Sequence, residues 1–170
     1  MNRPLKCFGS QVEETIRYLE RLHEDEKDPV KAVRLAGFLV LTVISALEVD
    51  VRDTCTETGG RFHSQFGTYV SASLSKTNAR VSVKELGQLI GRFSEVSQMT
   101  FQRRLDVLKR RCQRWPRSSL HAQYENLLTW RNSFAHTGTV SATFDEVMQA
   151  ARYEGLITRV FRDELRRIRP

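Results

Sequence analysis

Arg131, Asn132 and His136 lie within six residues of one another in the stretch WRNSFAHTG. A guanidinium binds an anion and stabilises added negative charge on it, and an imidazole takes up or releases a proton near neutral pH. His136 is expected in the last turn of a helix that Gly138 ends, where the helix dipole favours the imidazolium form. These residue types could carry out general acid–base chemistry beside a fixed positive charge, as transesterification of a phosphodiester requires.

The spacing of these residues limits how one helix can present them. Arg131 and His136 are five positions apart, about 140° around an ideal helix, so they do not share a face. Asn132 and His136 are four positions apart and do share a face. In a chain this rich in arginine, an Arg and a His at this spacing are a weak pattern when taken alone.

Arg131 also stands where its helix should be apolar. Its neighbours on the same stripe are Leu127 and Phe134, and a lone guanidinium buried there would be costly. Glu48 interrupts an apolar stripe on an earlier helix in the same way, so we expect Glu48 and Arg131 to pair if the two helices pack together. The alternative is that Arg131 extends to water and Glu48 pairs with Arg52, one turn along its own helix.

The net charge of +7 comes entirely from the second half of the chain. Residues 1–85 carry 12 basic and 12 acidic side chains, and residues 86–170 carry 15 basic and 8 acidic ones. The densest part, from Arg103 to Arg117, favours a polyanionic partner, because each phosphate contact adds salt-dependent affinity. The alternative is a solvated helix face. The basic side chains that we expect to bind this polyanionic partner are Arg103, Arg104, Lys109, Arg110, Arg111, Arg114 and Arg117.

Apolar residues recur at helical spacing through most of the chain, and no stretch alternates polar and apolar residues as a strand would. Gly59 and Gly60 are expected to stop the second helix. Capping boxes are expected at Ser10–Glu13, Ser82–Glu85 and Thr143–Glu146. The expected helices cover about 10–27, 29–58, 62–74, a segment after Ser82, a segment after 94–97, 119–137 and 144–168. The predicted fold is all-α, an up-and-down bundle of four main helices with one or two short extra helices, in a single domain over 1–170.

Neither the ends nor the apolar runs of the chain suggest a membrane protein. The longest apolar run, LAGFLVLTVISAL, has 13 residues, which is too short to span a bilayer, and the N-terminus has no apolar segment typical of a signal peptide. Three cysteines without a C-x-x-C pair suit a reducing compartment, where they would act as small apolar residues. We therefore expect a cytoplasmic protein with no membrane contact.

Other kinds of chemistry have little support in the sequence. His23, His63 and His121 show no metal-ligand spacing with cysteines or acidic residues, and the Gly59–Gly60 pair lacks the pattern of a phosphate-binding loop. The serines offer no nucleophile elbow. No metal and no cofactor are expected.

The segment RNSFAHTG at a helix end, followed by a short turn and the capping-box helix TFDEV, closely resembles the HEPN superfamily of α-helical ribonucleases. It is most similar to the RiboL-PSP type, in which a long early helix of the kind LVLTVISALEVDVRD carries an acidic residue. The layout covers most of the chain from about Val30 to Arg167, and the specific motif covers six residues. The chain departs from the family pattern at Thr137, which separates His136 from Gly138. It also has Gly138 where toxins paired with a nucleotidyltransferase antitoxin usually have tyrosine, which argues against that pairing.

The resemblance implies an endoribonuclease that cleaves RNA without a metal and leaves a 2′,3′-cyclic phosphate. Arg131 would hold the scissile phosphate, and His136 would move a proton to or from the 2′-hydroxyl or the leaving oxygen. Asn132 would position the phosphate or the histidine, and Glu48 would orient Arg131.

Members of the family usually dimerise, so the resemblance also implies a homodimer with a composite active site. The expected biology is a toxin or a defence or stress effector, with an antitoxin or regulatory protein as a further partner. The alternative is a non-catalytic helical module that binds RNA or a protein and keeps the Arg/His motif for structure.

Overall fold

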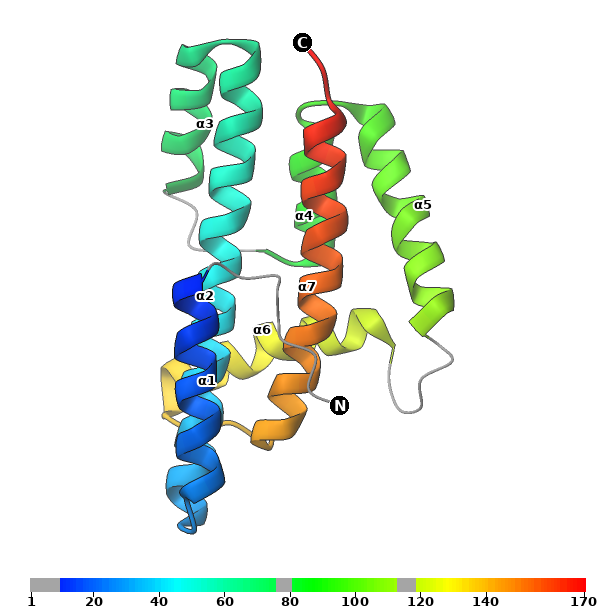
Figure 1. The fold of residues 1–170 in the computed structure, drawn as a ribbon. Helices are drawn as coiled ribbons and strands as arrows, with labels where there is room; N and C mark the ends of the chain where they lie inside the picture. Colours follow the sequence, from blue (N-terminus) through cyan, green and yellow to red (C-terminus); the bar gives the residue numbers. More distant parts are fainter. Residues whose placement is uncertain (1–9, 76–80, 113–118) are drawn as a thin grey trace. The chain divides into compact units, whose positions relative to one another are not determined.

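The structure is a computed structural model, which describes residues 10–75, 81–112 and 119–170 of the chain. Within these ranges every regular element is an α-helix, and no strand is present (Figure 1). The all-α class predicted from the sequence is confirmed. The helices are α1 (Ser10–Asp25), α2 (Pro29–Phe62), α3 (Ser64–Ser75), α4 (Val83–Gly91), α5 (Glu95–Cys112), α6 (Leu120–Thr137) and α7 (Phe144–Arg167).

The helices form two compact units, each made from segments that are far apart in sequence. Of the described residues, unit 1 holds 10–46 and 122–156, and unit 2 holds 47–75, 81–112, 119–121 and 157–170. Helices α2, α6 and α7 therefore contribute residues to both units. Each unit is described below by itself.

In unit 1, the apolar spacing of α1, with Val12, Ile16, Leu19 and Leu22 on one stripe, produces burial only at its centre, since Val12 is half-buried and Leu22 is exposed. Ile16 and Leu19 are buried, and the His23 ring stacks on Phe144 at the start of α7, with ring centroids 4.4 Å apart. The first part of α2 is buried more completely than α1, because several of its apolar side chains have no exposed surface: Ala36, Leu39, Val40 and Val43. These helices supply the core that supports α6.

Two of the predicted capping boxes are present. Ser82 accepts a hydrogen bond from the Glu85 backbone N–H, and the Glu85 carboxylate accepts one from the Ser82 backbone N–H. At the start of α7, the Thr143 N–H donates to Glu146 Oε2 over 2.8 Å, and the Glu146 N–H donates to Thr143 Oγ1 over 3.3 Å. The Thr143 N–H and the Thr143 hydroxyl, which donates to the same carboxylate oxygen over 3.0 Å, lower the pKa of Glu146. The box predicted at Ser10–Glu13 lies outside the described side chains.

In unit 2, α2 does not stop at Gly59 and Gly60 but continues to Phe62, so the predicted helix end was wrong. Gly59 of α2 and Gly67 of α3 instead allow α3 to approach the end of α2 closely, where the two helices lie side by side (Figure 1), whereas a Cβ on Gly60 would meet nothing within 4 Å. A Cβ on Gly67 of α3 would lie 2.9 Å from the Gly60 Cα. The absence of side chains here serves packing between helices rather than helix termination.

Helices α4, α5 and the last part of α7 form the rest of unit 2. The ring of Phe101 in α5 has no exposed surface and meets Phe161 of α7 edge to face, with centroids 6.5 Å apart. Buried phenylalanines of this kind typically contribute about 3–5 kcal/mol relative to alanine. The end of α7 is held by Arg61 of α2, whose guanidinium donates to the carbonyl oxygens of Leu165 and Arg166 over 2.7 and 3.0 Å.

Helix α2 is the one described helix long and apolar enough, by length and composition, to cross a membrane. Core helices of soluble proteins pass the same test, and only a buried apolar stripe distinguishes them. Several side chains of α2 are fully buried within the protein itself, among them Leu39, Val43 and Leu47. The burial is partial, since 39% of the most apolar 18-residue window of α2 is buried within the protein.

Candidate functional site

The end of α6 forms as the sequence predicts. Gly138 follows the helix with φ of +71°, the left-handed conformation that glycine adopts without strain, and its N–H donates to the Phe134 carbonyl over 2.9 Å. Thr137 Oγ1 donates to the Ser133 carbonyl over 2.8 Å and accepts from the Thr139 N–H over 3.3 Å. The turn that carries His136 is therefore well defined by hydrogen bonds.

Arg131 and Asn132 are brought together by their side chains. Arg131 Nη1 donates to Asn132 Oδ1 over 3.2 Å, and Arg131 is half-buried while Asn132 and His136 are exposed. Because Asn132 and His136 share a helix face, this hydrogen bond turns the guanidinium toward the face that carries the imidazole.

The motif helix is anchored to α2 through Phe134. The Phe134 ring lies over Gly37 so closely that a Cβ on Gly37 would fall 2.2 Å from two of its ring carbons. The same ring meets Phe38 nearly edge to face, at a centroid distance of 5.5 Å. Both contacts lie within unit 1, and they fix the last turns of α6 without using the polar side chains of the motif.

Glu48 lies in the part of α2 that belongs to unit 2, and Arg131 lies in unit 1. Glu48 is half-buried, so its carboxylate does interrupt the apolar face as the sequence suggested. The Glu48–Arg131 pair stays a prediction. Arg52, the alternative partner considered for Glu48, has its Nε 3.6 Å from Asp53 Oδ1.

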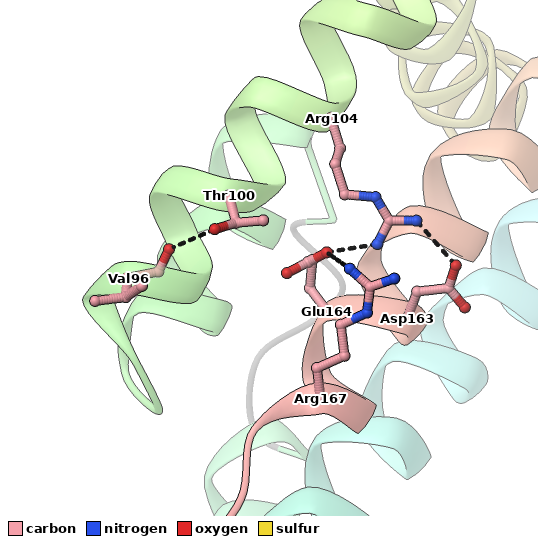
Figure 2. Close-up of polar contacts among 6 residues, drawn as sticks. All are labelled: Val96, Thr100, Arg104, Asp163, Glu164 and Arg167. Atoms are coloured by element: carbon pink, nitrogen blue, oxygen red, sulfur yellow. Dashed lines mark hydrogen bonds and ion pairs between the residues drawn. The ribbon is translucent and has the colours of Figure 1, made fainter.

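The basic residues of α5 divide into two groups. Arg103, Lys109, Arg110 and Arg111 are exposed to solvent. Arg104 points toward α7 instead, as Figure 2 shows, and donates to Glu164 and Asp163. Arg114 and Arg117 lie outside the described residues.

Glu164 is contacted by both Arg104 and Arg167 in Figure 2. Its side chain is only 3% exposed, and Arg167 Nη1 lies 3.3 Å from the same oxygen that Arg104 contacts. The hydrogen bond to Glu164 is the main reason that the pKa of Arg104 is raised, and Asp163 adds to it from 3.1 Å. Arg104 thus joins α5 to α7 in unit 2, and its predicted contact with RNA stays untested.

Sequence reasoning missed the contacts that α7 makes through its charged residues. Arg104 is separated from Asp163 and Glu164 by 59 and 60 positions, and no local pattern links them. The adjacent acids within the basic segment FRDELRRIR were a usable signal, because a nearly buried carboxylate in such a helix needs a cationic partner.

The described cysteines and metal-ligating side chains do not indicate a second catalytic site. Burial raises the pKa of the Cys55 thiol to about 12, and burial also raises the pKa of Cys112, so neither is a ready thiolate nucleophile. Across 10–75, 81–112 and 119–170, no group of three or more His, Cys, Asp or Glu side chains is placed to hold a metal ion.

No family model matches the chain, and comparison with curated proteins and with solved structures found no match either. The functional assignment therefore depends on the chemistry of the residues and on the resemblance of the RNSFAHTG segment.

Proposed function

We propose that this chain is a metal-independent endoribonuclease of the HEPN kind, which cleaves RNA by attack of the 2′-hydroxyl on the adjacent phosphate. The observation that carries the proposal is the hydrogen bond from Arg131 to Asn132, one turn before the exposed His136. It directs a cation toward a helix face that presents a titratable ring to solvent. A phosphodiester placed there would meet both groups.

In the proposed reaction, Arg131 binds the non-bridging oxygens of the phosphate and stabilises the extra negative charge of the transition state. His136 takes the proton from the 2′-hydroxyl, whose oxygen attacks phosphorus, and the 5′-oxygen of the next nucleotide leaves with a proton. The products are a 2′,3′-cyclic phosphate and a 5′-hydroxyl. Asn132 holds Arg131 in place, and Glu48 is proposed to orient the Arg131 guanidinium from the side away from the phosphate.

One imidazole supplies one proton-transfer group, and the reaction needs two. We therefore propose a homodimer in which the ends of two α6 helices meet and the second copy supplies the other histidine. The exposure of His136 supports this arrangement, because a ring already covered by its own chain could not reach a shared groove. The chain would form an up-and-down bundle of four main helices with shorter helices beside it.

The biological role that fits such an enzyme is that of a cytoplasmic toxin or defence effector, held in check by an antitoxin or regulatory partner. The exposed residues Arg103, Lys109, Arg110 and Arg111 are proposed to attract the RNA backbone. This contribution would be independent of base sequence and sensitive to salt.

The test is cleavage of a fluorescent single-stranded RNA in EDTA by wild type, Arg131→Ala and His136→Ala, with the exposed Arg21→Ala and His121→Ala as matched controls. We expect the two motif variants to lose at least about 100-fold in rate and the controls to lose none. Motif variants that cut as fast as wild type would overturn the site. A wild type that binds RNA in EDTA without cutting it would make the chain a binding module instead.

A further inference from the structure

A pocket of about 750 Å³ lies in unit 1, beside the turn that ends α6. One wall is the start of α2, and the other is the end of α6 with the turn after it. The lining side chains that matter here are Val30, Arg34, Phe38, Phe134, Thr137 and Thr139. The volume falls in the range of sites that hold small organic ligands, roughly 300–1,000 Å³.

The pocket combines an aromatic surface with polar groups at its rim. Phe38 is 51% exposed and Val30 is 59% exposed, which leaves large apolar surfaces open to solvent. Arg34 is exposed, and the hydroxyls of Thr137 and Thr139 lie 3.0 Å apart at the other wall. An aromatic face with a guanidinium and hydroxyl groups nearby is the combination that binds an unstacked nucleobase.

The walls are held in place before any ligand arrives. Phe134 packs on Gly37 and against Phe38, and the Thr137–Gly138–Thr139 turn is closed by its own hydrogen bonds. A site with fixed walls loses less conformational entropy when it binds.

The pocket is better suited to a base than to a phosphate. The free backbone N–H groups at the start of a helix would attract phosphate, but at α2 Asp28 already occupies that position. Its Oδ1 accepts from the Val30 N–H over 2.9 Å, and its carboxylate would repel a second anion. Arg34 is the cation left to meet the backbone phosphate next to a bound base.

We infer that this pocket binds the nucleobase next to the scissile phosphate of a single-stranded RNA, with the base stacked on Phe38. The inference rests on the proposed nuclease function, because it assigns to the pocket a part of that substrate. His136 directly precedes Thr137 of the pocket wall, so a base bound here belongs to a nucleotide beside the imidazole. The pocket would thereby select unpaired RNA, since a base inside a duplex cannot enter it.

The test uses short RNAs with a single cleavable ribose, all other sugars being 2′-methoxy, and with the base on one side or the other of the cut replaced by an abasic residue. For wild type, we expect one of the two abasic positions to lower kcat/KM about tenfold. Phe38→Ala should cleave the intact RNA with a kcat/KM about tenfold below that of wild type. Replacing the base by an abasic residue should lower the kcat/KM of this variant no further. Tyr18→Ala, which removes an equally exposed ring elsewhere in unit 1, should behave as wild type.

Phe38 also touches Phe134, so Phe38→Leu serves as a second variant that keeps apolar contact and removes the flat face. It should melt like wild type and still lose the discrimination against the abasic RNA. A Phe38→Leu protein that keeps the discrimination would overturn the base site while leaving the nuclease intact.

If wild type cuts none of these RNAs, the proposed function fails and the base site is judged by binding alone. Phe38→Trp is then titrated with a fully 2′-methoxy oligonucleotide and its fluorescence is compared with that of wild type. Saturable quenching that an abasic oligonucleotide does not reproduce would support the base site. No quenching, or equal quenching by both oligonucleotides, would overturn it.

Discussion

Helices α5 and α6 each carry a half-buried arginine, but the two arginines have different surroundings. Within unit 2, Arg104 is neutralised by Asp163 and by the nearly buried Glu164. Within unit 1, Arg131 donates to the neutral amide of Asn132, and among the described residues of that unit no carboxylate forms an ion pair with it. Arg104 is placed to hold helices together, while Arg131 is the arginine that we propose binds the phosphate.

The comparison is tested most strongly by removing each guanidinium in turn. Arg131→Ala should lower RNA cleavage by at least about 100-fold and change the free energy of unfolding by less than about 0.5 kcal/mol. Arg104→Ala should lower the free energy of unfolding because it removes a contact within unit 2. The protein that remains folded should cut RNA at nearly the wild-type rate. Rates are normalised to the folded fraction measured by circular dichroism. The comparison fails if both variants lose activity in proportion to stability.

Removing the acid that Arg104 faces should produce the next largest effect. Glu164→Ala leaves the Arg104 guanidinium without its closest partner, and we expect a loss of roughly 3 kcal/mol in the free energy of unfolding. Asp163→Ala, at a carboxylate that is 38% exposed, should cost less than about 1 kcal/mol. Urea denaturation followed by far-ultraviolet circular dichroism measures both. Equal losses in the two variants would show that Glu164 is not the centre of the contact.

The exposed arginines of α5 should differ from Arg104 in their effect on RNA binding. Arg110→Ala combined with Arg111→Ala should weaken binding roughly tenfold at moderate salt and make the slope of log K against log salt less negative by about 1.4. Arg21→Ala combined with Lys31→Ala removes the same charge from exposed positions in unit 1. An identical loss in both pairs would mean that net charge alone drives binding.

The smallest effect concerns the helix start that follows the motif turn. Thr143→Ala should lower the free energy of unfolding by about 1 kcal/mol at neutral pH. Because the pKa of Glu146 is lowered in the folded protein, its stabilising contribution is present above its ordinary value of 4.5 and is lost as the pH falls through the folded value.

Glu146→Gln isolates this titration. Its stability deficit relative to wild type should be largest near pH 7 and should shrink as the pH is lowered below 4.5. A deficit that stays constant from pH 7 to pH 3 would show that the charge of Glu146 does not stabilise the start of α7.

Local signals predicted much of the fold. The capping boxes at Ser82 and Thr143 and the helix end at Gly138 depend on residues only a few positions apart, and all three are present. Gly59 and Gly60 misled the prediction because a glycine that ends a helix and a glycine inside a helix, such as Gly59 where α3 packs, look the same in sequence. Only the position of Gly67 in α3 distinguishes the two cases.

The candidate site was less predictable than the fold. The motif residues could be located in the sequence, but the hydrogen bond between Arg131 and Asn132 depends on side-chain conformation. The pocket formed by Arg34, Phe38 and the turn after α6 depends on the packing of α2 against α6, which brings together residues about 100 positions apart. No local pattern marks Phe38 as exposed, because its neighbours in the sequence are apolar and mostly buried.

The central claim is that Arg131 and His136 promote attack of a 2′-hydroxyl on phosphorus. The most direct measurement is mass spectrometry of the fragments that wild type produces from a short RNA in EDTA, with His136→Ala in parallel. The account predicts fragments ending in a 2′,3′-cyclic phosphate and fragments beginning with a 5′-hydroxyl, both missing from the His136→Ala sample. Fragments with 3′-hydroxyl and 5′-phosphate ends, or the same cyclic products from His136→Ala, would contradict it.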